Sequence, residues 1–332
     1  MSEYQWESPH RNYVNWHKGQ IHCHNQASVA EVLDHYREAK YAFACVTPHN
    51  HSSPDVQRDG ILHIRSGEDG RFHRHHILAL GINFSRVDPN LDGDRDGISK
   101  FKTCPCANIG ARLDYYTNVQ GTVAVLAHPR DGHRRGWFSC PGGWTLEELK
   151  QYANEYTGIE IYNATTGDCC AWWDEVLRSG KRVWGFGSDD MHDLDSRKHF
   201  NRSWIVVNSE RSPAEQWDIL ANIKAGNFHT VVRDPDVTGE PGGGELDWIG
   251  PELYISVEEN CIRVETDEDS HIGLIGSRNG VPTAISASGP GRSLVYHAQE
   301  GDQYFRAVVR RTQHERVYAS SSQPILRGVI VN

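Results

Sequence analysis

The chain has 332 residues with 38% hydrophobic content, and its formal net charge is −10 at pH 7. This length suffices for one large domain and a small one, and the negative charge disfavours nucleic acid or an anionic membrane as a partner. No segment has the composition of a signal peptide or the length of a membrane span. The eight cysteines lack paired C-x-x-C spacing, so we expect reduced thiols in a cytoplasmic protein.

The first predicted elements form a strand–helix–strand unit. A short apolar run ends in His22 and His24, and because a strand has a period of two, both imidazoles lie on one face. A helix follows over 28–40, beginning with a serine cap and an apolar stripe, and a strand follows over 41–47. This spacing predicts parallel pairing of the two strands.

The same alternation continues to about residue 230. Strands are predicted over 61–67, 77–81, 122–127, 158–163, 183–188 and 203–207, and helices over 109–119, 145–156, 169–180 and 213–225. The composition changes at 233–249, which is rich in glycine and proline and indicates a linker. Short alternating runs follow at 253–257, 261–265, 271–275, 293–297, 304–310 and 317–320. We therefore predict an α/β domain over 1–232, a linker over 233–249 and a small antiparallel β-sandwich over 250–332.

Residues of metal-ligand type border several of the predicted strands. They are His22, His24, His49, Glu68, His76, His128, Asp190 and His192. All except His76, which begins its strand, stand at a strand's C-terminal end or just beyond it. In a barrel of parallel strands these ends meet on one face, where catalytic residues collect. Neutral imidazoles and a shared carboxylate suit two closely spaced divalent ions, which activate water for phosphoryl displacement.

These motifs resemble the PHP (polymerase and histidinol phosphatase) family of metal-dependent phosphoesterases. The resemblance covers roughly residues 17–230, through H-x-H at 22–24, T-x-H at 47–49, Glu68 with His76, A-H-P at 127–129 and D-x-H at 190–192. It implies a distorted (β/α)7 barrel, a TIM-like fold with a two- or three-metal site at its strand ends. The C-terminal sequence is similar to the subgroup that carries a β-sandwich and includes a carbaryl hydrolase.

By position, the resemblance implies two ligand sets that share Glu68. The first ion is held by His22, His24, Glu68 and Asp190, and the second by Glu68, His76 and His128. Zinc, manganese or iron suits these ligands. A hydroxide that bridges the two ions then attacks the substrate phosphorus, with Glu68 holding both ions in place.

The resemblance also implies a third ion facing His49 and His192, either of which can protonate the leaving oxygen. Two departures from the family pattern reduce the number of ligands at this third site. Pro48 stands where the family has aspartate, and residues 29–30 are apolar where the family has aspartate or histidine. We expect two ions and leave the third open. His51 or Asp189 is able to complete it.

Other residues near the predicted site have two interpretations. Asp189 is either a ligand in place of Asp190 or a hydrogen-bond acceptor beside it. Glu160 and Asn163 end a strand on the same face and serve either structural hydrogen bonding or substrate contact. The basic loop after His128 contains Arg130, Arg134 and Arg135, which either bind a substrate phosphate through forked guanidinium groups or lie in solvent.

We therefore expect a metal-dependent hydrolase, a phosphoesterase acting on a small phosphomonoester. One alternative is hydrolysis of a carbamate or carboxylic ester at the same metals. Another is a catalytically inactive, metal-stabilised binding protein, which the thin third site favours and the complete Glu68-bridged pair opposes. The expected partner is a small-molecule substrate, neither nucleic acid nor membrane, and a homo-oligomer stays open.

Overall fold

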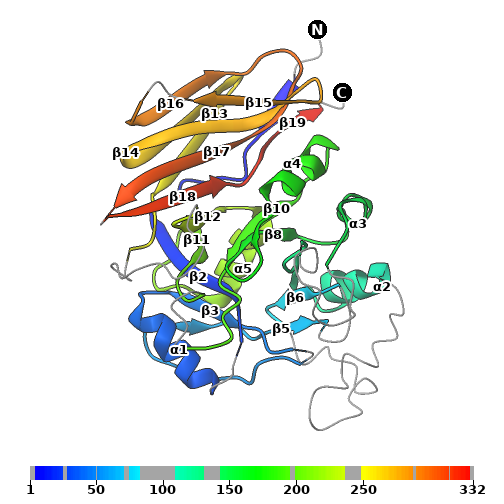
Figure 1. Cartoon of the computed structure of the whole chain (residues 1–332), viewed down its shortest axis with the longest axis vertical. Coiled ribbons are helices and arrows are strands. Elements are labelled where there is room, and N and C mark those ends of the chain that lie inside the picture. Colours follow the sequence, from blue (N-terminus) through cyan, green and yellow to red (C-terminus); the bar gives the residue numbers. More distant parts are fainter. Residues whose placement is uncertain are drawn as a thin grey trace.

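The protein is described by a computed structural model that covers residues 4–24, 28–49, 51–70, 75–82, 109–130, 143–194, 199–235, 248–286, 289–313 and 315–329. Strands predominate over helices in this part of the chain (Figure 1). They form two sheets, and the larger one reaches from the candidate site to the C-terminal strands at the opposite end of the molecule. The predicted Arg134 and Arg135 and most of the predicted linker lie outside the described residues.

The larger sheet combines strands from the start, middle and end of the chain. Its main path, in spatial order, is β1 (Tyr4–Glu7), β19 (Ile325–Val329), β17 (Asp302–Gln313), β18 (Arg316–Ser322), β12 (Phe228–Arg233), β11 (Ser203–Ser209), β2 (Asn15–Cys23), β3 (Phe43–Val46) and β4 (Leu62–His63). Four further strands join it through β14: β13 (Leu253–Glu258), β14 (Cys261–Arg278), β15 (Val281–Ser286) and β16 (Gly291–His297). β2 and β3 pair in parallel, as the strand–helix–strand spacing predicts.

The smaller sheet carries the second half of the candidate site. Its order is β10 (Trp184–Ser188), β8 (Gly158–Asn163), β7 (Val123–Leu126), β6 (Ile77–Leu80) and β5 (Ser66–Asp69), with β9 (Gly167–Asp168) beside β8. β6 runs antiparallel to both β5 and β7. A parallel crossover needs a dozen or more residues, and β5 and β6 are separated in the sequence by residues 70–76 alone, which agrees with their antiparallel pairing.

Two isolated parallel bridges connect the sheets beside the candidate site. One pairs Cys23 with Met191 and the other pairs His49 with Glu68. The ladders of the described residues thus form two sheets linked at two points, and not one continuous ring. The distorted (β/α)7 barrel stays a prediction.

The helices lie outside the sheets and begin largely where the sequence predicts. They are α1 (Val29–Glu38), α2 (Ile109–Asp114) with the π-helical turn η3 (Tyr115–Val119), α3 (Leu146–Gln151), α4 (Cys170–Arg178) and α5 (Gln216–Ala225). α1 starts with a capping box, in which Ser28 Oγ accepts from the Glu31 backbone N–H and the Glu31 carboxylate accepts from the Ser28 N–H. α3 begins with the same device, built from Thr145 and Glu148.

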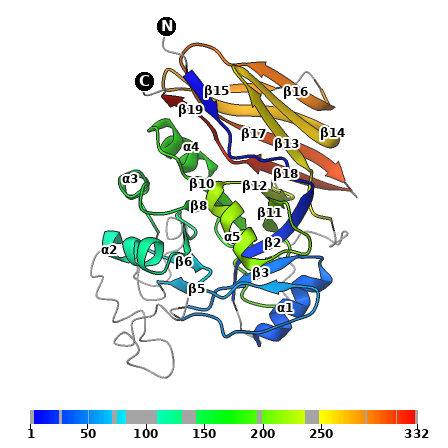
Figure 2. The same ribbon diagram turned by 180° about the vertical axis from the view of Figure 1, so that it is seen from behind.

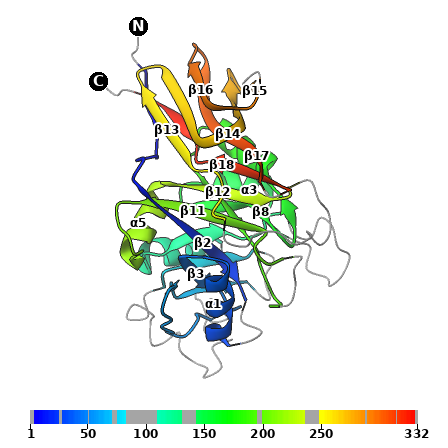
Figure 3. The same cartoon turned by 90° about the vertical axis from the view of Figure 1, so that its left-hand side faces the viewer.

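The C-terminal strands are continuous with the rest of the larger sheet. β18 pairs with β12 (Figure 3), and β1 from the N-terminal region pairs with β19 (Figure 2). β14 joins two predicted strands into one long strand, while β12, β15 and β19 were not predicted as separate strands. The division into domains 1–232 and 250–332 stays a prediction, and hydrogen bonds cross it at β12–β18.

A buried ion pair ties α4 to the C-terminal strands. Arg306 on β17 donates from Nε and Nη2 to the two carboxylate oxygens of Asp174, both at 2.9 Å. The guanidinium also lies 5.1 Å from the centre of the buried Trp173 ring. Tyr304 donates to the same carboxylate at 3.2 Å.

No helix within the described residues is long and apolar enough to cross a membrane.

The glycines after α4 and α5 allow a test of backbone strain against packing. Gly180 and Gly226 both have φ = 79°, which L-residues with a side chain adopt at a cost. A Cβ at Gly226 would lie 2.8 Å from the Trp184 ring, whereas a Cβ at Gly180 would meet no described atom within 4 Å.

We expect Gly180→Ala to lower the free energy of unfolding by about 1 kcal/mol, from backbone strain alone. Gly226→Ala should cost at least about 1 kcal/mol more, because Trp184 has to move. Urea unfolding of both variants measures the difference. Equal losses would show that the Trp184 contact is relieved without cost.

Candidate metal centre

The predicted ligand residues converge where the two sheets meet. His22 and His24 stand at the end of β2, His49 just after β3 and Glu68 in β5. His128 follows β7, and Asp190 and His192 follow β10. His76 precedes β6, and the antiparallel direction of β6 brings its start beside the ends of β5 and β7, with Ile77 opposite both Asp69 and Leu126. The reversed strand therefore explains the one exception in the sequence pattern.

Glu68 lies at the centre of the cluster and is fully buried. Its Oε1 is 2.7 Å from His76 Nδ1 and 3.0 Å from His128 Nε2. Its Oε2 is 2.8 Å from His49 Nδ1, 3.5 Å from His24 Nε2 and 3.6 Å from His22 Nε2. Each carboxylate oxygen thus faces its own group of imidazoles.

Asp190 forms a second centre of negative charge in the cluster. Its Oδ1 lies 3.1 Å from His24 Nε2, 3.2 Å from His22 Nε2 and 3.5 Å from His192 Nδ1. The Nε2 atoms of His22 and His24 are themselves only 3.1 Å apart. The two imidazoles therefore direct the same nitrogen at one carboxylate oxygen.

Two buried atoms show that these groups fit a cation. Glu68 Oε2 and His49 Nδ1 are 2.8 Å apart, yet neither of these buried atoms has a hydrogen-bond partner among the described residues. Buried polar atoms are normally satisfied. Ligand atoms about 2.0–2.1 Å from one zinc ion lie about 3.3 Å apart in a tetrahedral site. The separations of 3.1–3.6 Å around Glu68 and Asp190 match that spacing.

Within the described part of the chain, four groups of side chains place their ligand atoms close enough to hold an ion. They are His22–His24–Glu68, His22–His128–Asp190, His49–Glu68–His76 and His24–His49–His192. These groups do not coincide with the ligand sets that the resemblance implies. His22, from the set of the first ion, also groups with His128 from the set of the second, and His49, assigned to the third ion, groups with His76 from the set of the second. The cluster is continuous, so ligands are shared between neighbouring positions.

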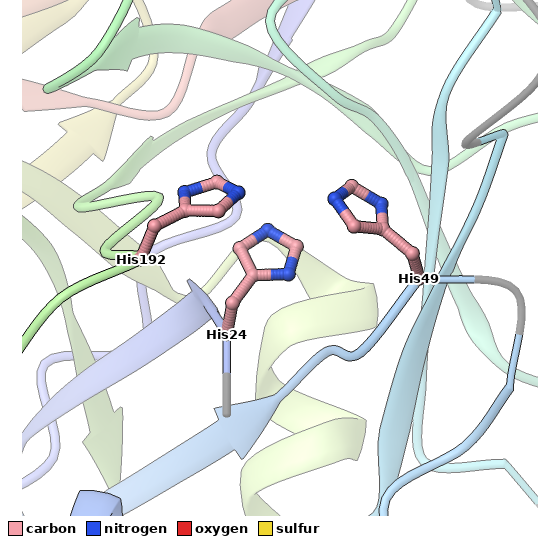
Figure 4. Close-up of side chains that lie close together, drawn as sticks. All are labelled: His24, His49 and His192. Atoms are coloured by element: carbon pink, nitrogen blue, oxygen red, sulfur yellow. The ribbon is translucent and has the colours of Figure 1, made fainter. Parts of the chain in front are cut away.

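The pair His49 and His192, which the resemblance assigns to a third ion, has a further candidate ligand beside it. His24 lies between His49 and His192, with its ring 4.4 Å from the first and 3.9 Å from the second (Figure 4). His51 instead directs Nδ1 at the His49 carbonyl oxygen, 2.8 Å away, and is in none of the four groups. The residue that completes this group is therefore His24, which the sequence assigned to another ion.

The structure places Asp190, and not Asp189, among the histidines. Asp189 accepts backbone N–H groups from residues 201–203 at 2.7–2.9 Å and the Tyr36 hydroxyl at 3.1 Å. These contacts tie the segment after β10 to β11 and α1. Asp189 thus acts as a hydrogen-bond acceptor beside the cluster.

Arg130 lies against α4. Its Nη1 donates to the Asp168 carbonyl oxygen at 3.0 Å, and its guanidinium is 5.9 Å from the centre of the Trp172 ring. A phosphate contact from Arg130, Arg134 or Arg135 stays a prediction.

The carboxylates perturb the pKa values of the histidines. Burial alone would lower the pKa of His22, but Asp190, Glu160 and Glu68 raise it well above its ordinary value. Burial also opposes protonation of His128, whose pKa is nevertheless raised to about 9, chiefly by Glu68. Burial dominates at His24 and lowers its pKa to about 4. Protons on His22 and His128 therefore offset two of the three negative charges of Glu68, Glu160 and Asp190 in the metal-free protein.

This charge balance predicts proton release on metal binding. At pH 7 the raised pKa values keep His22 and His128 protonated in the metal-free protein, and imidazoles have to be neutral to bind a metal. We expect about two protons to be released per chain at pH 7. The release should fall as the pH passes the His128 pKa of about 9, because that proton is then already lost.

Calorimetric titration with zinc in buffers of different ionisation enthalpy counts these protons. Metal binding at pH 7 with no proton release would contradict the charge balance.

Sequence reasoning left Glu160 open and did not single out Ser188 and Thr165. Glu160 contacts His22 Nδ1 at 2.8 Å, and Ser188 donates to Glu160 at 2.5 Å. Thr165 Oγ1 donates to the Asp190 carbonyl oxygen at 3.3 Å. The sequence signal that could have singled out Glu160 is its position as one charged residue in the otherwise uncharged run 158–161.

Comparisons with known proteins give little further guidance. No protein-family model matches the chain, and no curated protein matches it. One solved structure, of a provisionally named metal-dependent phosphoesterase from Bifidobacterium adolescentis, is similar over 54% of this chain and 88% of that chain. The identity is 12% and the TM-score 0.35. A likeness this distant establishes neither a shared fold nor a shared activity.

Proposed function

We propose that the protein is a metal-dependent hydrolase that holds two divalent ions and cleaves a small phosphomonoester. The observation that carries this proposal is the position of Glu68, whose two oxygens face separate groups of histidines at 2.7–3.6 Å. A fully buried carboxylate placed between imidazoles on both sides fits a ligand shared by two cations. Within the cluster, Glu68 Oε2 and His49 Nδ1 are buried and have no hydrogen bond among the described residues.

In this proposal two ligand sets share Glu68. His76 and His128 would hold one ion with Glu68 Oε1, while His22, His24 and Asp190 would hold the other with Glu68 Oε2. Bound divalent ions lower the pKa of water and stabilise the attacking and leaving oxygens of a phosphoryl displacement. Zinc, manganese and iron all accept such ligands.

His49 and His192 are the most exposed members of the cluster, with 28% and 41% of their side chains accessible. This exposure supports a role for them on the side from which a substrate would enter. His192 donates from Nδ1 to the Asp190 carbonyl oxygen at 2.9 Å, which leaves Nε2 to exchange a proton with the leaving oxygen. In this proposal the more buried residues bind the ions, and the two more exposed histidines, His49 and His192, contact the substrate and exchange protons with it.

Metal analysis and a substrate panel test the proposal together. The protein, purified without added metal, is measured by elemental analysis and then assayed on phosphomonoesters, carboxylic esters and carbamates. We expect two or more metal equivalents per chain and turnover of phosphomonoesters. Metal content near zero, also after incubation with zinc, manganese or iron(II), would refute the site. Turnover of carboxylic esters or carbamates alone would refute the phosphoesterase assignment and keep the hydrolase.

A further inference from the structure

Glu160 is a buried carboxylate in the middle of β8 that contacts the candidate ligands without belonging to any of the four ligand groups. Its Oε1 lies 2.8 Å from His22 Nδ1 and accepts from Ser188 Oγ at 2.5 Å. Its Oε2 accepts from the His128 backbone N–H at 2.6 Å and from Asn163 Nδ2 at 3.0 Å. Four hydrogen bonds therefore surround one side chain that is 1% exposed.

The contact with His22 fixes which ring nitrogen faces the ions. A carboxylate accepts hydrogen bonds, so His22 Nδ1 has to carry the hydrogen that points at Glu160. The lone pair of the neutral ring is then on Nε2, which lies 3.1 Å from His24 Nε2 and 3.2 Å from Asp190 Oδ1. A metal-binding histidine commonly donates its other N–H to such a carboxylate, which holds the ring in orientation.

Glu160 also supports two candidate ligands whose backbone is strained. His128 has φ = 27° and Asp190 has φ = 48°, both in the left-handed region. The His128 N–H is held directly by Glu160 Oε2. Asp190 is linked through Asn163, whose Nδ2 donates to both Glu160 Oε2 and Asp190 Oδ2, the latter at 3.3 Å. Such conformations persist where the surroundings determine them strongly.

We propose that Glu160 is a positioning residue that orients His22, His128 and Asp190 together as one metal-binding unit. One side chain thereby couples ligands from β2, β7 and β10, which are far apart in the sequence. The inference rests on the proposed function, because it assigns Glu160 a role toward the ions of that site. It adds a residue outside the ligand set whose loss would weaken metal binding without removing a ligand.

The test is metal affinity in Glu160→Gln. Glutamine preserves the size but has one acceptor oxygen and one donor group, so it cannot accept all four hydrogen bonds. We expect the affinity for zinc, measured by competition with a chromogenic chelator, to fall about 10–100-fold, the usual effect of losing an outer partner of a ligand. The cobalt(II)-substituted variant should also show an altered visible spectrum, because the ligand geometry changes.

Asp218→Asn provides the matched control. Asp218 is also a buried carboxylate, and it lies in α5 and accepts from Ser209 Oγ and from Asn222 Nδ2. This variant should lose stability in urea unfolding but retain the metal affinity and cobalt spectrum of the parent. Equal affinity in Glu160→Gln and the parent, or equal loss in both variants, would overturn the positioning role.

A measurement on the unsubstituted protein tests the same inference if Glu160→Gln does not fold. In the zinc-loaded protein, long-range ¹H–¹⁵N correlation spectra should show His22 protonated at Nδ1 and metal-bound at Nε2. The opposite arrangement would refute the role of Glu160 while leaving the proposed function intact. An unsubstituted protein that binds no metal would instead refute the proposed function itself.

Discussion

Replacing Glu68 by glutamine is expected to remove bound metal and to lower kcat by at least about 10³-fold. Loss of one preorganised stabilising donor typically costs 10²–10³-fold, and Glu68 serves both ligand groups. Glutamine keeps the shape but removes the negative charge between His22, His49, His76 and His128. Within the ligand groups, Asp190 would then be the remaining carboxylate to offset two cations. Elemental analysis and phosphomonoester turnover measure both effects.

Glu148→Gln is the control for this substitution. Glu148 also contacts a histidine, with its Oε1 3.0 Å from His75 Nε2, but it lies on α3 outside the ligand groups. The control should retain parental metal content and turnover. Full metal content and activity in Glu68→Gln would contradict a shared ligand at Glu68 and, with it, the proposed centre.

Breaking the Asp174–Arg306 pair should destabilise the fold more than any surface change. Asp174→Ala leaves the Arg306 guanidinium, which is 4% exposed, without its carboxylate partner. Removing one partner of a buried pair costs about 3–5 kcal/mol, and we expect about 3 kcal/mol because Asp174 retains 14% exposure. Urea unfolding of the metal-free protein measures the loss and separates it from metal binding.

A double-substitution cycle distinguishes the pair from its individual side chains. Asp174→Ala combined with Arg306→Met should recover part of the loss, because the uncompensated charge is gone. The exposed pair Arg292–Asp269, with side chains 68% and 72% exposed, should contribute less than about 1 kcal/mol in a parallel cycle. A loss of under 1 kcal/mol in Asp174→Ala would show that the contact between α4 and β17 does not depend on this ion pair.

Local sequence signals located several elements because their causes are local. The capping boxes at Ser28 and Thr145 join residues three apart, so both helix starts were readable from spacing. The glycine after α5 likewise ended its helix as predicted. β14 was predicted as two strands because its middle, 266–270, is polar; the long ladders with β16 and β17 lie on either side of this middle, where Thr266 pairs with β13 and Ser270 with β16. Local sequence patterns do not indicate which distant strand will pair with a given segment.

The sequence by itself determined the set of candidate ligands, because histidines and carboxylates at strand ends are recognisable by residue type and position. The tertiary structure decided which of them meet. It brought His76 to the site by reversing β6, turned Asp189 away, and joined His24 to His49 and His192. It also surrounded Glu160 with hydrogen bonds from three segments. These outcomes depend on strand direction, register and the left-handed backbone at His128 and Asp190, which arise only when distant segments pack together.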